Sequence, residues 1–256
     1  MKNYDTCTTK DFLHLKKDVE NFLPSLESNL EDRYVGTWHR TFENGTSLPN
    51  SARVIWLQTH KFFADIRIPE GSRELQMAFS GHTVIKDDRC EWHQWCGLSS
   101  PVSDTARLEF SSDTLKIKEF CDDGATEVWE KEDTKVKRIM SLQLIDEQDI
   151  EMLTVKYDHS NTKKGFFLVV GNDFMRTLED TQEGDYESCF GKILESNKWL
   201  VSDSTKETIE GDVLYETAVM SRFGDIILER VDSNTVRRWL IHEINGDIPI
   251  IINCTK

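Results

Sequence analysis

The sequence contains no long hydrophobic run. No apolar stretch approaches the length of a membrane-spanning helix, so we expect no membrane span. The first residues, "MKNYDTCTTKDFLHLKKDVENFL", lack the apolar core and the small-residue cleavage site of a signal peptide. These two absences predict a cytoplasmic protein.

Common cofactor-binding and catalytic motifs are also missing. The six cysteines are scattered and form no CxxC pair, so we expect reduced thiols in the cytoplasm. No Gly-rich phosphate loop, GxSxG elbow, HExxH or GxGxxG sequence is present. The sequence therefore gives no reason to expect a cofactor.

Positive charge is in short supply. Lysine and arginine total 31 against 46 aspartate and glutamate, which gives a formal net charge of −15. A surface this acidic repels phosphate groups, so nucleic acid and anionic membrane surfaces are unfavourable partners.

Helical periodicity is confined to the N-terminal segment. Apolar residues recur at helical spacing over residues 9–32, where Pro24 interrupts the pattern. We expect two short helices or one kinked helix there.

After Tyr34, short runs rich in Val, Ile, Phe, Trp and Thr alternate with Gly, Asn, Asp and Ser clusters, which is typical of antiparallel β-sheet. Both halves of the chain have this texture, on either side of a charged stretch at 130–138. The fold class predicted is mainly β, with two antiparallel barrels in tandem and a short helical N-terminus. The predicted boundaries are 1–33 for the helical segment, 34–133 for the first barrel and 134–256 for the second. One large barrel that uses all the strands is the alternative.

Gly36 and Trp38, in "YVGTWHR", stand at the start of the first predicted strand after the helical segment. This arrangement resembles the G-x-W opening of lipocalins and fatty-acid-binding proteins, the calycin superfamily. The resemblance implies that Gly36 allows close packing where the barrel begins and that Trp38 plugs its closed end. The two halves also resemble a small fungal family of tandem lipocalin-like barrels, which has no clear activity to transfer.

The same superfamily places a basic residue from a late strand over that tryptophan. Arg237 and Arg238 are equivalents only if one barrel uses the whole chain. With two barrels, the first must close on its own last strand, where Lys131 and Lys135 fit the role poorly.

The stretch "ARVIWLQTHKFFADIRIPEG" predicts a hairpin with His60 and Lys61 at its tip. A two-residue tip pairs Gln58 with Phe63, Trp56 with Asp65, and Val54 with Arg67. Alternation then gives one face that is nearly all apolar and another with a mixed character. The apolar face carries Ile55, Leu57, Phe62, Ala64, Ile66 and Ile68, and the mixed face carries Trp56, Gln58, Phe63, Asp65 and Arg67.

The mixed face is the predicted ligand site. Inside a barrel, Asp65 and Arg67 neutralise each other, Gln58 orients a ligand, and Trp56 supplies an apolar wall. The alternative is a solvent-facing ion pair of little energetic value. Trp92, from the later stretch "CEWHQWCG", is a further ligand-binding candidate.

"CEWHQWCG" also has a spacing that suggests metal binding. On a straight strand, however, Cys90 and Cys96 share one face while His93 points to the other, and no fourth ligand is nearby. We therefore predict no metal site. Trp92 and Trp95 are expected on opposite faces, with one directed into the core or lumen.

Three functions fit these features. The first is the binding of a small hydrophobic or aromatic metabolite with a polar or anionic end in a barrel cavity. The second is a cofactor-independent isomerase, cyclase or lyase acting in that cavity, with Asp65 and one of His39, His82 and His93 as acid or base and Arg67 as anion holder. The third is a non-catalytic interaction scaffold with a filled interior. The sequence specifies neither the ligand nor the oligomeric state.

Overall fold

The computed structural model describes residues 29–44, 52–69, 76–97, 104–132, 138–149, 162–215, 220–249 and 251–253. Most of the predicted helical segment, residues 1–28, lies outside this described part. Residues 29–35, at its end, form a turn and no helix, so the helical N-terminus is not supported. No helix among the described residues is long and apolar enough to cross a membrane.

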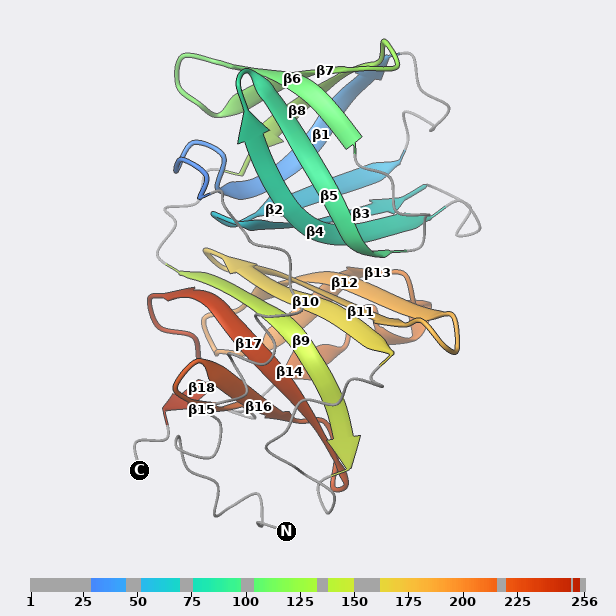
Figure 1. Ribbon diagram of the computed structural model, residues 1–256, viewed down its shortest axis with the longest axis vertical. Coiled ribbons are helices and arrows are strands. Elements are labelled where there is room, and N and C mark those ends of the chain that lie inside the picture. Colours follow the sequence, from blue (N-terminus) through green and yellow to red (C-terminus); the bar gives the residue numbers. More distant parts are fainter. Residues whose placement is uncertain are drawn as a thin grey trace.

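The first eight strands form a closed antiparallel barrel. β1 pairs with β2 on one side and with β8 on the other, which leaves no free edge (Figure 1). This confirms the prediction of an antiparallel barrel. The strands are β1 (Gly36–Asn44), β2 (Arg53–Gln58), β3 (Phe62–Ile68), β4 (Met77–Lys86), β5 (Arg89–Gly97), β6 (Asp104–Phe110), β7 (Lys116–Cys121) and β8 (Thr126–Lys131).

The remaining strands form one curled ten-stranded sheet, in the order β14-β13-β12-β11-β10-β9-β17-β16-β15-β18. The second half therefore forms a separate antiparallel sheet, as predicted, but this sheet is curled and not a closed barrel. The alternative of one large barrel that uses all the strands is wrong. The strands are β9 (Ile139–Asp149), β10 (Lys163–Val170), β11 (Asp173–Asp180), β12 (Asp185–Ile193), β13 (Trp199–Ser204), β14 (Val213–Tyr215), β15 (Met220–Phe223), β16 (Ile226–Arg230), β17 (Thr235–Asn245) and β18 (Ile251–Asn253), with a short 3₁₀ helix, η4 (Glu207–Ile209), between β13 and β14.

The curled sheet repeats the winding of the barrel. Strands β9 to β14 follow one another in chain order, as β1 to β6 do. β17 then returns to pair with β9, as β8 returns to pair with β1. The two hairpins β7–β8 and β16–β17 therefore hold equivalent places in the two sheets.

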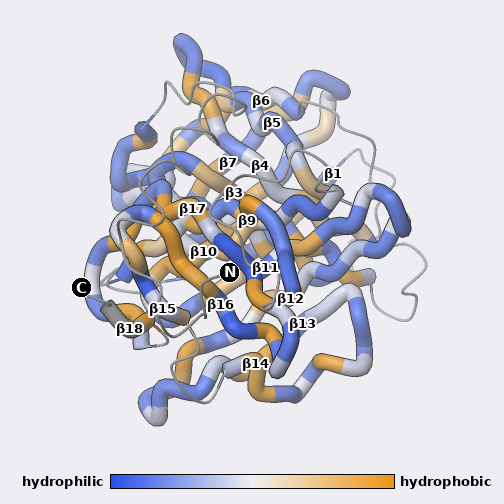
Figure 2. Tube along the Cα trace, turned by 60° about the horizontal axis from the view of Figure 1, so that its bottom comes forward, coloured by the Kyte–Doolittle hydropathy of each residue, from blue (hydrophilic) through white to orange (hydrophobic). Residues whose placement is uncertain are grey.

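A shared apolar core joins the barrel to the curled sheet. The apolar face predicted for the β2–β3 hairpin points out of the barrel and packs against β10, β11 and β12. In Figure 1 these three strands lie on the side of the curled sheet that is nearest to the barrel. Two buried side-chain hydrogen bonds cross this interface, from Thr37 to Asp173 at 2.7 Å and between Ser80 and Thr177 at 2.7 Å. Figure 2 shows the hydrophobic residues concentrated along the strands and the hydrophilic ones at the projecting turns.

A β-bulge interrupts the β4–β5 pairing between Ser80 and Gly81, opposite Gln94 and Cys96. A Cβ on Gly81 would lie 1.9 Å from the carbonyl oxygen of His93, so the close approach of the two strands requires glycine. Because one extra residue reverses the alternation, Cys90 lies inside the barrel and Cys96 lies in the shared core. The prediction that these two cysteines share a face is therefore wrong.

Candidate functional site

The predicted register of the β2–β3 hairpin is confirmed. Gln58 lies opposite Phe63, Trp56 opposite Asp65 and Val54 opposite Arg67. The mixed face therefore points into the barrel. It meets Trp92, which alternation places on the inner face of β5 while Trp95 packs outside against the shared core.

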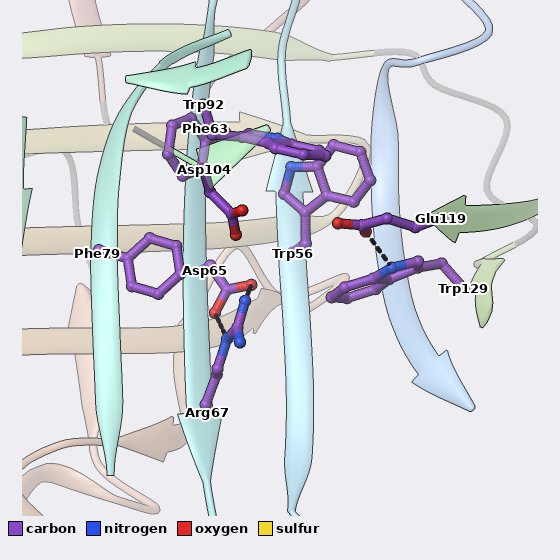
Figure 3. A pocket seen from close by; sticks show the side chains of 9 residues that line it. All are labelled: Trp56, Phe63, Asp65, Arg67, Phe79, Trp92, Asp104, Glu119 and Trp129. Atoms are coloured by element: carbon purple, nitrogen blue, oxygen red, sulfur yellow. Dashed lines mark hydrogen bonds and ion pairs between the residues drawn. The ribbon is translucent and has the colours of Figure 1, made fainter. Parts of the chain in front are cut away.

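A small recess lies among these inward-facing side chains (Figure 3). Its volume is about 20 Å³, which is room for one water molecule. Five of the six residues predicted to bind a ligand line it, and four further residues complete the wall. The lining residues are Trp56, Phe63, Asp65, Arg67, Phe79, Trp92, Asp104, Glu119 and Trp129.

Gln58, the sixth predicted residue, is not part of this lining. Its amide nitrogen donates to the carbonyl oxygens of Thr59 and Phe62 at 2.9 and 3.0 Å. Its amide oxygen accepts from Trp56 Nε1 at 3.2 Å and from Thr83 Oγ1 at 2.8 Å. These four bonds use its hydrogen-bonding capacity, so Gln58 holds Trp56 and the hairpin turn in place.

The predicted Asp65–Arg67 pair is present. Arg67 Nε donates to Asp65 Oδ1 at 2.8 Å, and the guanidinium carbon lies 5.1 Å from the centre of the Phe79 ring. Burial lowers the pKa of Arg67, but the Asp65 carboxylate outweighs it and raises that pKa above its ordinary value. Arg67 therefore stays positively charged and is already paired with the Asp65 carboxylate.

Glu119 is one of the four lining residues that the sequence did not predict. It is buried on β7, and its Oε2 accepts a hydrogen bond from Trp129 Nε1 at 2.8 Å (Figure 3). Burial, with smaller contributions from the charges of Glu127 and Asp104, raises the pKa of Glu119 to about 8, against the opposing effects of Trp129 and Arg67. At neutral pH this carboxyl is mostly protonated.

Glu119 belongs to a row of three inward-facing glutamates on adjacent strands. Glu119 of β7 lies directly opposite Glu127 of β8, which lies directly opposite Glu43 of β1. Arg40 Nη1 lies 2.6 Å from Glu43 and 3.0 Å from Glu127. Like charges at directly opposed positions destabilise a sheet, and Arg40 relieves this only for the two glutamates that it contacts.

The curled sheet contains an equivalent glutamate–tryptophan pair. Glu229 Oε2 accepts from Trp239 Nε1 at 2.8 Å, in the β16–β17 hairpin that corresponds to β7–β8. Each glutamate stands ten residues before its tryptophan, so the repeated Glu-x9-Trp spacing is a signal that the sequence offered.

The equivalent pair has a different neighbour. The guanidinium of buried Arg176, on β11, donates to Tyr215 at 3.1 Å, and Tyr215 donates to Glu229. Arg176 Nη1 itself lies 3.7 Å from Glu229. By hairpin register, Arg176 occupies the place that Asp65 occupies in the barrel. The same carboxyl position thus has an arginine 3.7 Å away in the curled sheet, which also pairs with Glu187 at 2.7 Å, and faces an aspartate in the barrel.

The predicted acid–base pairs do not form. His39, His82 and His93 point out of the barrel, on the opposite side of the sheet from Asp65. His39 Nε2 lies 3.3 Å from Glu132, and His93 Nε2 lies 3.1 Å from Glu91. His82 stacks on His93 with ring centres 4.6 Å apart. The structure therefore does not bring His93, the catalytic candidate, to Asp65.

Cys90, His93 and Cys96 occupy three different environments. Cys90 lies in the barrel interior, Cys96 in the shared core and His93 on the outer surface. Across the described ranges, no group of three or more His, Cys, Asp or Glu side chains is arranged to hold a metal ion.

Trp38 is fully buried at one end of the barrel, and its Nε1 donates to the carbonyl oxygen of Tyr34 at 2.9 Å. The Lys131 ammonium, from the strand that closes the barrel, lies 4.9 Å from the centre of the Trp38 ring. A Cβ on Gly36 would lie 2.4 Å from Lys131 Cε, so Gly36 leaves room for that lysine.

The judgement that Lys131 fits this role poorly is therefore wrong. The other candidates, Arg237 and Arg238, are on β17 of the curled sheet. They pair there with Glu147 and Asp146, at 2.7 Å in each case.

Fold and site together describe an antiparallel β-barrel protein with an aromatic, carboxyl-lined recess. No family model matches the chain, and no curated protein matches its sequence. The structure is similar to the crystal structure of an uncharacterised protein from Saccharomyces cerevisiae, with a TM-score of 0.55 and 12% sequence identity. The match covers 82% of this chain and 99% of the yeast chain. This likeness shows a shared fold.

Proposed function

We propose that the protein is a lipocalin-like binding protein that takes a small hydrophobic or aromatic molecule with a polar end into the recess of the eight-stranded barrel. The observation that supports this most is Glu119, a buried carboxyl whose equivalent in the curled sheet has an arginine partner. A buried group without such a partner costs stability, and groups of this kind concentrate at binding and catalytic sites.

The composition of the wall supports the same proposal. Trp56 stands at its centre, with ring centres 5.6 Å from those of both Trp92 and Trp129. Aromatic walls with a few polar groups are typical of small-molecule sites. The Gly36, Trp38 and Lys131 arrangement at the barrel end supports the likeness to lipocalins, and the proposed compartment is the cytoplasm.

Entry of a ligand requires the recess to widen, because a volume of about 20 Å³ holds no more than a water molecule. Arg67 and Asp104 stand where this can occur. The Arg67 side chain is 15% exposed, and Asp104 is exposed at the start of β6. In this proposal these two side chains swing aside while Trp56 and Trp129 stay in place.

Tryptophan indole signals in a nitrogen–proton correlation spectrum test the proposal site by site. A mixture of small aromatic compounds that carry cationic, neutral or anionic groups is added to the full chain. We expect at least one compound to shift the signals of Trp56, Trp92 and Trp129, while those of Trp199 and Trp239 in the curled sheet stay unchanged. If no compound shifts the three barrel signals, or if all five move alike, the proposal is wrong.

A further inference from the structure

The barrel interior carries more acidic than basic side chains. Arginine is represented by Arg40 and Arg67, which each contact at least one carboxylate. Two acidic groups of the recess, Asp104 and Glu119, have no ion-pair partner among these contacts. The inward-facing acidic residues are Glu43, Asp65, Asp104, Glu119 and Glu127.

An anionic ligand group does not suit this interior. Arg67 is the basic residue of the recess, and both of its contacting nitrogens are directed at the Asp65 carboxylate, at 2.8 and 3.4 Å. An incoming anion has to displace Asp65 from Arg67 or lie beside the carboxylates of Asp65 and Asp104. Both are unfavourable, because the first leaves a buried carboxylate without its partner and the second places like charges together.

The aromatic walls of the recess favour a positively charged ligand group. The faces of tryptophan, and to a lesser degree those of phenylalanine, attract cations, most strongly where water is excluded. Trp56, Trp92 and Trp129 surround the space into which Glu119 and Asp104 are directed (Figure 3). Aromatic faces combined with surplus carboxyl groups form an environment for a positively charged nitrogen.

We propose that the polar end of the ligand is cationic, an ammonium or related nitrogen cation on a hydrophobic or aromatic body. This inference rests on the proposed function and replaces the anionic end predicted from Arg67. The cation donates to Glu119 and Asp104 and lies against the tryptophan faces. The apolar body extends past Phe79 toward the solvent-exposed rim of the recess, beside Arg67. In the curled sheet, Arg176 stands at the register position of Asp65 and supplies a positive charge 3.7 Å from Glu229.

Binding of such a cation is coupled to the loss of a proton. Glu119 is protonated below its pKa of about 8, and a bound ammonium favours its ionised form. The affinity for an ammonium ligand therefore rises from pH 6 to pH 8. An aliphatic ammonium group stays charged over this range, since its pKa is about 10.

Three probes with the same aromatic body separate the possibilities: 2-phenylethylammonium, 2-phenylethanol and phenylacetate. Each is titrated calorimetrically into the full chain at pH 8, with the barrel indole signals as a check on location. We expect the ammonium to bind at least tenfold more tightly than phenylacetate. Glu119→Gln, and Asp104→Asn as a second variant at the exposed edge, should each weaken ammonium binding about fivefold or more. Glu130→Gln, on the outer face of β8, is the matched control and should leave it unchanged.

The outcomes distinguish this inference from the proposed function. If phenylacetate or phenylethanol binds as tightly as the ammonium and shifts the same indole signals, the cationic assignment fails and the binding function stands. Undiminished ammonium affinity in both Glu119→Gln and Asp104→Asn also overturns the assignment. If none of the three probes shifts a barrel indole signal, both proposals are wrong.

Discussion

The Lys131 ammonium lies over the Trp38 ring, 4.9 Å from its centre, and so joins the last strand of the barrel to the first. Its Nζ also donates to the carbonyl oxygen of Arg33 at 3.0 Å. One side chain therefore covers the buried tryptophan and ties down the segment that leads into β1. The glycine at position 36 is explained by the same lysine, because its stem occupies the space of a Cβ.

Trp38→Ala should lower the free energy of unfolding by about 3–5 kcal/mol, because it removes a fully buried aromatic side chain and leaves a cavity at the barrel end. Denaturant titration measures this loss. Trp38→Phe, which keeps most of the apolar volume, should lose less. A loss of only a few tenths of a kcal/mol for Trp38→Ala is the result that would contradict the assignment of Trp38 as the plug of the barrel.

Gly36→Ala should destabilise the protein by about 1 kcal/mol when Lys131 is present, because the added methyl group displaces the lysine stem. The same substitution should cost less in a Lys131→Ala background, where the space is empty. A double-mutant cycle of unfolding free energies measures the difference, which we expect to exceed about 0.5 kcal/mol. Additive effects would show that Gly36 is needed for another reason.

His60, at the tip of the β2–β3 hairpin, connects the barrel to the curled sheet, and we expect its contribution to stability to depend on pH. Its Nδ1 lies 2.6 Å from Glu243 of β17, and its Nε2 lies 2.9 Å from Asp32. Partial burial lowers the pKa of His60, but the hydrogen bonds to the two carboxylates outweigh it, so the pKa is raised above 6.5.

A raised pKa in the folded state means that protonated His60 contributes stability fully below pH 6.5, and that this contribution is lost as the pH rises through the folded-state pKa. His60→Gln should therefore cost about 1 kcal/mol at pH 6 and less at pH 9. The unfolding free energies of both proteins at the two pH values test this. An equal cost at both values would mean that the charge on His60 has no role.

Strand alternation and a two-residue turn were sufficient to predict the β2–β3 hairpin, down to the Trp56–Asp65 pairing. These features are local, because side chains alternate along any regular strand. Alternation failed at Cys96, where the bulge beside Gly81 reverses the faces. That bulge depends on two strands that approach closely, which the sequence of one strand does not specify.

Other features depend on contacts between distant strands. Glu119 lies three strands or more from the β2–β3 hairpin, and only the closed barrel brings it to Asp65 and Trp56. The contact of Lys131 with Trp38 is not predictable from its own segment, because nothing there shows that β8 returns to β1. The partner of the apolar hairpin face was equally hidden, since that face packs on the curled sheet.

We propose that two equivalent carboxyl groups have opposite roles, with Glu119 serving binding and Glu229 serving folding. The folded-state pKa of Glu119, about 8 against 4.5 when unfolded, means that the wild type loses stability as the pH rises from 4.5 through 8. Glu119→Gln does not titrate and keeps an acceptor for Trp129. Glu229→Gln removes the carboxylate charge beside buried Arg176.

The unfolding free energies of these two variants at pH 8, measured beside the wild type, test this claim most directly. We predict that Glu119→Gln is more stable than the wild type by about 2–4 kcal/mol and that Glu229→Gln is less stable by about 2–3 kcal/mol. A loss of stability in Glu119→Gln comparable to that in Glu229→Gln would contradict the account, because both carboxyl groups would then be parts of the core.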